Sequence, residues 1–178
     1  MADDIRDLLG GWRPDEGDEG PENENLQPRP LREKKVEVLG LWRAAPGGDD
    51  TRLTESVLLL RDSRGRRLPI EIGAFETMAI HYALQGTPSE RPLTHELTRL
   101  LVEQLGGTIE RVVIDDVWEK TFYAKVEIAA PGGKSALSID SRPSDAIALA
   151  LRADAPIYVA EDVLVSSAHD EGGGSDDD

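Results

Sequence analysis

Three short segments between residues 34 and 72 are rich in apolar residues and have strand-like patterns; the second has four apolar residues in succession, and the third alternates apolar and polar positions, a period of two that is typical of β-strands. The first segment starts near Lys34, the second covers residues 56–61, and the third covers residues 68–72. Because Pro69 cannot donate a backbone hydrogen bond to a neighbouring strand, we expect the third strand to lie at an edge of the sheet or to start irregularly.

After Gly73 the spacing of apolar residues changes to that of amphipathic helices. Apolar positions three and four residues apart predict a helix of about three turns that ends at Gly86. A second helix is predicted from Thr94, as its N-cap, to Gly106. The buried stripe predicted for this helix consists of Leu97, Leu100, Leu101 and Leu105.

Further strands and a third helix follow in the second half of the chain. Residues 108–117 and 121–129 have strand character, and a third strand ends at Ile139. The helix runs from Pro143, which suits a first helical position, to about Arg152. Because the residues from 146 to 151 are all apolar, this helix should be buried on nearly all sides.

The elements follow the order βββ-αα-βββ-α-β, with the last strand at 156–159 and a final turn or helix at 160–165. This order predicts an α+β fold: a single compact domain over residues 34–165, with a mixed or antiparallel sheet packed by about three helices. The length of 178 residues agrees with one domain and two tails.

Most of the negative charge lies outside the predicted domain. The segments 1–33 and 166–178 are acidic and poor in apolar residues, so we expect them to be mostly disordered. Residues 1–30 hold nine acids and three bases, and residues 166–178 hold five acids and no base, which leaves −4 of the formal charge of −15 for the centre.

Within residues 3–12, four apolar residues share one helical face: Ile5, Leu8, Leu9 and Trp12. This segment is either a frayed terminus or a motif that binds a partner protein.

Composition excludes several classes of chemistry. The chain has no cysteine, so disulfides, thiolate nucleophiles and cysteine-bound zinc are excluded. No apolar run reaches the roughly 20 residues of a membrane span, and the acidic N-terminus does not have the residue order of a signal peptide. We therefore expect a cytoplasmic protein with no membrane partner. The net acidity argues against nonspecific nucleic-acid binding by bulk charge but leaves room for a local basic site.

Two helix starts carry an arginine followed by proline, hydroxyl and carboxylate groups: R-P-L-T-H-E at 91–96 and D-S-R-P-S-D at 140–145. Free N–H groups and the helix dipole at such positions favour anions such as phosphate. The candidate phosphate-binding residues are therefore Arg91, Thr94, Arg142 and Ser144. The alternative is ordinary helix capping and local ion pairing, which use the same residue types.

Carboxylates at strand ends and helix starts offer candidate catalytic groups. Asp140, Asp145 and Glu76 could activate water, and Asp140 with Glu76 could hold a Mg²⁺ or Mn²⁺ ion. His95, beside Arg91, suits a general acid or base. The alternatives are that Glu76 is a favourable first-turn helix charge and that His95 is an ordinary first-turn histidine.

The sequence resembles the bifunctional nuclease (BFN) domain family over roughly residues 34–165. The resemblance rests on L-P-I-E-I-G-A-F-E-T-M-A-I at 68–80, R-P-L-T-H-E-L at 91–97, T-F-Y-A-K-V at 121–126, I-D-S-R-P-S-D-A-I-A-L-A-L-R at 139–152 and A-P-I-Y-V at 155–159, in this order. Ser141 stands where the family typically has alanine, and the hairpin tip at 118–120 also departs from its pattern.

The family takes its name from DNase and RNase activity attributed to plant members, and its bacterial members are described as compact α+β domains that self-associate. The resemblance therefore implies a nuclease that hydrolyses phosphodiester bonds of DNA or RNA, and a homo-oligomer, most simply a dimer. The acidic tails and the missing catalytic signature favour the alternative, a non-catalytic regulatory domain that binds a ligand or partner through the same polar corner.

Overall fold

The computed structural model describes residues 32–43, 56–86, 89–130 and 137–169. The amphipathic segment at 3–12 and most of both predicted tails lie outside these residues. All elements described below belong to one compact unit.

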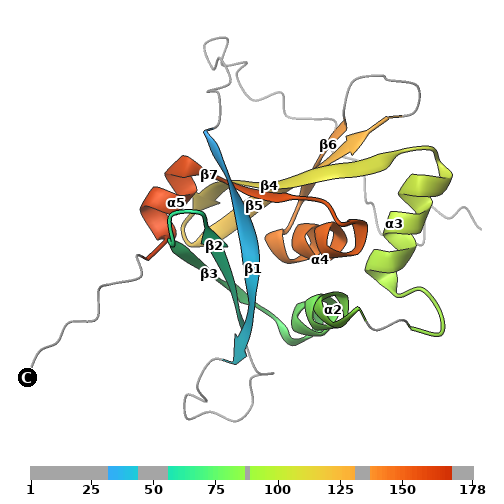
Figure 1. Cartoon of the computed structure of the whole chain (residues 1–178), viewed down its shortest axis with the longest axis horizontal. Helices are drawn as coiled ribbons and strands as arrows, with labels where there is room; N and C mark the ends of the chain where they lie inside the picture. Colours follow the sequence, from blue (N-terminus) through green and yellow to red (C-terminus); the bar gives the residue numbers. More distant parts are fainter. Residues whose placement is uncertain (1–31, 44–55, 87–88, 131–136, 170–178) are drawn as a thin grey trace, which may run out of the picture. The chain divides into compact units, whose positions relative to one another are not determined.

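A seven-stranded mixed sheet forms the framework, with the strand order β3-β2-β1-β7-β4-β5-β6 (Figure 1). Neighbouring strands are antiparallel except for β4 and β7, which run parallel. The predicted strands are confirmed, and β3, which contains Pro69, lies at an edge of the sheet as expected. The strands are β1 (Glu33–Arg43), β2 (Ser56–Asp62), β3 (Arg67–Ile72), β4 (Thr108–Trp118), β5 (Thr121–Ala129), β6 (Leu137–Ser141) and β7 (Ile157–Ala160).

Four helices accompany the sheet in the described part of the chain: α2 (Ala74–Gln85), α3 (Thr94–Gln104), α4 (Pro143–Ala153) and α5 (Glu161–Ser167). Gly86 ends α2 in the left-handed conformation, which glycine adopts without steric cost. The α+β class and the predicted order of elements are confirmed, with α5 as the final helix.

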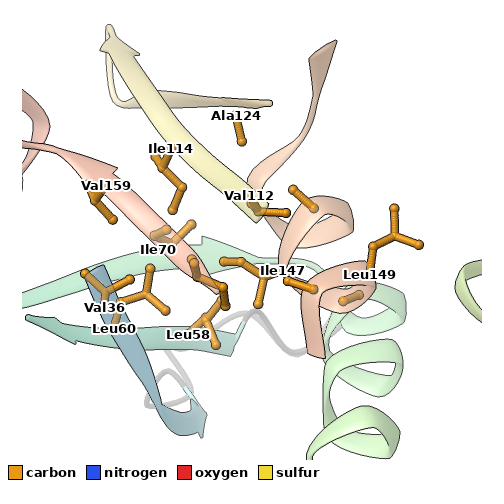
Figure 2. Close-up of a cluster of buried hydrophobic side chains, with 14 of the residues drawn as sticks. Val36, Leu58, Leu60, Ile70, Val112, Ile114, Ala124, Ile147, Leu149 and Val159 are labelled. Atoms are coloured by element: carbon orange, nitrogen blue, oxygen red, sulfur yellow. The ribbon is translucent and has the colours of Figure 1, made fainter. Parts of the chain in front are cut away.

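Helix α4 is the centre of the packing. It contacts α2 and α3 on one side and strands β4 and β5 on the other (Figure 1). Ile147 is fully buried, as are the alanines at 146, 148 and 150, whose small side chains allow neighbouring backbones to come close. Figure 2 shows Ile147 among Leu58 of β2, Val112 of β4 and Ile70 of β3, so a single core joins both halves of the sheet.

The predicted buried stripe of α3 is wrong for three of its four leucines. Leu97, Leu101 and Leu105 are 49%, 54% and 78% exposed. Helix α3 instead turns Leu100 and Val102 inward, because it packs beside α4 at the margin of the core. The spacing of apolar residues predicts that one face of a helix is apolar. Whether that face is buried depends on the element that packs against the helix.

The boundaries of the folded part also differ from the prediction at the C-terminal end. Helix α5 extends to Ser167, and His169 exchanges two backbone hydrogen bonds of 2.8 Å with Arg67 of β3. Residues 166–169 therefore belong to the folded unit and not to the tail. Thr94 is the first residue of α3, and Leu93 holds the N-cap position that was predicted for it.

Among the described residues, no helix combines the length and the apolar character that a membrane crossing requires. The cytoplasmic location stays a prediction.

The central position of α4 predicts a large difference between two identical substitutions. Leu149→Ala, at a position 8% exposed in α4, should lower the free energy of unfolding by about 2–5 kcal/mol because it leaves a cavity. Leu105→Ala, at a position 78% exposed, should change it by less than about 0.5 kcal/mol. Urea unfolding followed by circular dichroism measures both values, and equal losses would contradict the central role of α4.

Candidate functional site

The N-terminus of α4 begins directly at the end of strand β6. Arg142 occupies the N-cap position with an extended backbone, and Pro143 follows as the first helical residue. No side chain caps this helix, and the hydroxyl of Ser141 donates instead to the carbonyl of Arg142 at 3.1 Å. Neither Ser141 nor Ser144 therefore caps the N-terminus of α4 with its side chain.

Arg142 joins two carboxylates from different helices. Its Nε donates to Oδ2 of Asp145 at 2.7 Å, and its Nη1 donates to Oε1 of Glu76 in the first turn of α2 at 2.9 Å. These hydrogen bonds and charges raise the pKa of Arg142. The side chain is still 65% exposed, so its remaining N–H groups can reach a ligand.

Asp145 also holds His95 of α3. The Nε2 atom of His95 lies 3.0 Å from Oδ1 of Asp145. An ionised carboxylate can only accept, so Nε2 of His95 is the donor in this contact, and in the neutral tautomer with this hydrogen Nδ1 is the basic nitrogen. A carboxylate that fixes a histidine in this way is the usual support for a general base.

The charge on Asp145 is maintained by its two donors. Burial raises the pKa of the Asp145 carboxyl, but the hydrogen bonds from Arg142 and His95 outweigh burial and leave the pKa below the ordinary value of 3.8. Asp145 is therefore ionised at neutral pH.

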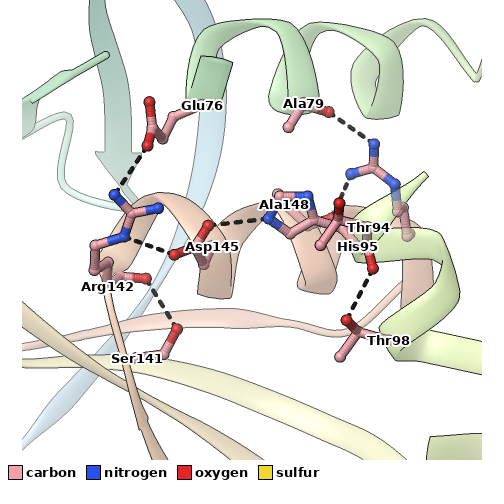
Figure 3. A network of polar contacts seen from close by, with 10 residues as sticks. Glu76, Ala79, Thr94, His95, Thr98, Ser141, Arg142, Asp145 and Ala148 are labelled. Atoms are coloured by element: carbon pink, nitrogen blue, oxygen red, sulfur yellow. Dashed lines mark hydrogen bonds and ion pairs between the residues drawn. The ribbon is translucent and has the colours of Figure 1, made fainter. Parts of the chain in front are cut away.

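Glu76, His95, Arg142 and Asp145 form one network, which we call the α4 network (Figure 3). Its members come from α2, α3 and α4 and so link all three helices. The network places a histidine and an exposed arginine on the two oxygens of one carboxylate, an arrangement suited to proton transfer beside a bound anion.

Asp140 is not part of this network. Its backbone pairs with Lys125 of β5, whereas Ser141 pairs with Ala124. Ala124 is buried against the helices and Lys125 is exposed, and successive side chains on a strand point to opposite faces. Asp140 therefore lies on the sheet face opposite α4.

The side chains of the remaining candidates for phosphate binding make no hydrogen bond to the α4 network. Ser144 is buried at the start of α4, and Arg91 and Thr94 are exposed before and at the start of α3. The contacts found there are local, from Ser89 Oγ to the carbonyl of Arg91 and from Thr98 Oγ1 to the carbonyl of Thr94.

The residues predicted for Mg²⁺ or Mn²⁺ do not fit that role together. Glu76 and Asp145 both accept from Arg142, and Asp140 is on the other face of the sheet. In the ranges that the structure describes, no group of three or more histidine or carboxylate side chains could hold a metal ion.

Sequence reasoning missed Arg152 in the last turn of α4. Its guanidinium donates to the carbonyls of Ala148 at 2.8 Å and of Ala79 in α2 at 2.9 Å. The sequence does show a single arginine at the end of a mostly apolar helix. Its contact with Ala79 could not be predicted, because the two residues are 73 positions apart in the chain.

The family model described as the bifunctional nuclease domain matches residues 57–171, a range that contains the whole α4 network. An uncharacterized protein of Mycobacterium tuberculosis is 44% identical over 114 residues, which cover 64% of this chain and 66% of that protein. Bifunctional nuclease 2 of Arabidopsis thaliana is 29% identical over 104 residues, 58% of this chain and 32% of the plant protein. Bifunctional nuclease 1 of Oryza sativa subsp. japonica is 28% identical over 104 residues, 58% of this chain and 31% of that protein. The chain thus spans just under two thirds of the mycobacterial relative and about a third of the plant relatives.

The lowered pKa of Asp145 predicts a pH-dependent contribution to stability. A carboxylate whose pKa is depressed by folding stabilises the native state above its unfolded-state pKa, near 3.8, and loses this effect as the pH falls through the folded value. Asp145→Asn should therefore be less stable than the wild type at pH 7, and the difference should shrink below about pH 4. Urea unfolding from pH 7 to pH 3 tests this, and a difference that does not change with pH would contradict the proposed pairing.

Proposed function

The chain belongs to the bifunctional nuclease domain family, and from this premise we propose that it is a nuclease that cleaves phosphodiester bonds at the α4 network. The observation that carries the proposal is the pair of contacts on Asp145, with His95 on one carboxylate oxygen and Arg142 on the other. The names of the plant relatives, at 28–29% identity, support nuclease chemistry.

In the proposed reaction, each residue of the network has a separate task. Asp145 keeps the hydrogen of His95 on Nε2, and Nδ1 accepts a proton from the attacking hydroxyl. Arg142 donates to a non-bridging phosphate oxygen through N–H groups that its two carboxylates leave free. Glu76 holds the other side of the guanidinium and so fixes where the phosphate can bind.

This donor set suits RNA better than DNA. In RNA the 2′-hydroxyl is positioned beside the phosphorus, so a histidine base is enough to start an intramolecular attack. The 2′ oxygen bonds to phosphorus and gives a 2′,3′-cyclic phosphate, and the 5′ oxygen leaves and takes a proton from water. DNA has no 2′-hydroxyl and needs an activated water. Because the carboxylates of the network are already bound to Arg142, no step is assigned to a metal ion.

A second candidate function follows from the same contacts. With His95 neutral, the α4 network has a formal charge of −1, and both of its carboxylates have cationic or N–H partners. Such a closed network can simply hold three helices together. In that case the domain is a non-catalytic regulatory module that binds a ligand or a partner.

The test compares two histidines. Purified protein is incubated with labelled single- and double-stranded DNA and RNA, in Mg²⁺, in Mn²⁺ and in EDTA. We expect cleavage of RNA that persists in EDTA, and His95→Asn should lower the rate at least about 100-fold. His81→Asn, at an exposed histidine of α2, is the matched control and should cleave as the wild type does.

Equal cleavage by His95→Asn and the wild type would reject the α4 network as the site. If the folded wild-type protein cleaves none of the four substrates, the non-catalytic function is favoured instead. Circular dichroism and a thermal melt for each variant separate loss of the site from loss of the fold.

We also propose that the domain forms a homodimer, with the exposed leucines of α3 at the interface. Leu97, Leu101 and Leu105 are four residues apart and form a stripe along the helix. The positions around the stripe, Thr94, Thr98 and Gln104, carry no charge, so two acidic copies of the chain can approach here without direct repulsion.

The dimer predicts a change in mass after one substitution. Leu101→Glu places a charge in the stripe and should yield a monomer, whereas Val165→Glu, at an exposed position of α5, should leave the dimer intact. Sedimentation equilibrium of the full chain measures both masses. A wild-type monomer at micromolar concentration, or a dimer that persists in Leu101→Glu, would contradict this interface.

A further inference from the structure

A groove outside the α4 network lies between α2 and the start of α3. Its volume is about 810 Å³, within the usual range for small-molecule sites. The residues that matter for its chemistry are Met78 and Tyr82 of α2, Leu93 and Glu96 near the start of α3, and Leu151 and Arg152 at the end of α4.

The walls of this groove are apolar and accessible. Met78, Tyr82 and Leu93 are all exposed, although each projects from or beside a helix that packs on the core. Tyr82 offers an aromatic face, and a methionine side chain adapts to the shape of a flat ligand. Such walls suit a planar aromatic group better than a polar chain.

Arg152 gives the groove an under-compensated positive charge. Its hydrogen bonds go to the carbonyls of Ala79 and Ala148, and the dashed line at Ala79 in Figure 3 marks the first of them. Burial lowers its pKa, whereas the pKa of Arg66, Arg99 and Arg142 is raised by carboxylate partners. Two carbonyls use only part of the five N–H donors of a guanidinium.

Glu96, the acidic residue in the wall, makes no hydrogen bond to Arg152, and its charge raises the pKa of Arg152 by less than burial lowers it. The carboxylate of Glu96 accepts from Nη2 of Arg99 at 2.5 Å, so its charge is largely compensated within α3. The groove therefore combines apolar walls, an aromatic ring and a fixed cation, a set complementary to an aromatic body that carries an anionic group.

We propose that this groove binds one nucleotide, with the base against Tyr82 and Met78 and the phosphate on Arg152. The choice of a nucleotide among aromatic anions rests on the proposed nuclease function. Glu96 follows His95 directly in α3, so one wall residue of the groove is next to a member of the α4 network in the chain. Arg142 and Arg152 are separated by ten positions, or roughly 15 Å along α4, so a strand cleaved at Arg142 could place a nucleotide further along the strand at Arg152.

The experiment measures binding, so it does not depend on cleavage. Isothermal titration calorimetry of the full chain is performed with adenosine monophosphate, adenosine, inorganic phosphate and dodecanoate. We expect one molecule of adenosine monophosphate per chain, with an affinity at least about tenfold above that of adenosine or inorganic phosphate.

Two matched tyrosines locate the site. Tyr82→Ala should weaken adenosine monophosphate at least about fivefold, the lower limit for loss of one base-stacking contact. Tyr123→Ala, at a tyrosine of similar exposure in β5 (42% against 40%), should leave the affinity unchanged. Arg152→Gln should weaken adenosine monophosphate and not adenosine, and Arg152→Lys should recover part of the loss; thermal melts check that each variant is folded.

Any of the following results would overturn the proposal: no binding of adenosine monophosphate, equal binding by Tyr82→Ala and the wild type, or tighter binding of dodecanoate than of the nucleotide. Arg142→Gln separates this proposal from the nuclease proposal. This variant should lose cleavage and still bind adenosine monophosphate in the groove. If the wild type binds adenosine monophosphate but cleaves no substrate, only the nuclease proposal is rejected. Loss of binding in Arg142→Gln would place the nucleotide at the α4 network and reject the groove.

Discussion

Burial of α4 is the constraint on which the rest of the domain depends. The helix is apolar over most of its surface and packs on the sheet and on two other helices, so polar contacts concentrate at its two ends. Arg142 stands at the first end and Arg152 at the last turn. Their electrostatic situations are opposite, because Arg142 has two carboxylate partners and Arg152 donates to carbonyls. The α4 network therefore forms around Arg142 at the first end of the helix, and the groove is next to Arg152 at the other end.

This arrangement explains how an acidic chain can offer a site to a phosphate. The formal charge of −15 opposes binding of a polyanion at long range. Attraction must then come from short-range donors that are already oriented, and a guanidinium held by fixed partners has little entropy left to lose when a ligand binds. We therefore expect short single-stranded substrates to be favoured over long duplexes, since each additional phosphate adds repulsion from the acidic chain.

The sequence was sufficient for the elements and for the central position of α4, because strand and helix periods and six successive apolar residues are local signals. It was insufficient for the site. Glu76 and Arg142 are 66 positions apart, and His95 and Asp145 are 50 apart, so only the packing of three helices brings them together. Asp140 was misplaced for a related reason: it is close to Arg142 in sequence, but the alternation of side chains in β6 sends it to the other face of the sheet. The leucines of α3 had the right spacing, but no local pattern could identify which face α4 would cover.

Chemical rescue of His95→Gly tests the central claim most directly, because it asks whether the imidazole itself takes part in cleavage. The variant is incubated with labelled single-stranded RNA in increasing concentrations of free imidazole, with His81→Gly as the control. We expect that His95→Gly is inactive alone and that its cleavage rate rises with imidazole, whereas His81→Gly is active and does not respond. A folded His95→Gly protein that stays inactive at every imidazole concentration, or that cleaves without imidazole, would contradict a catalytic His95.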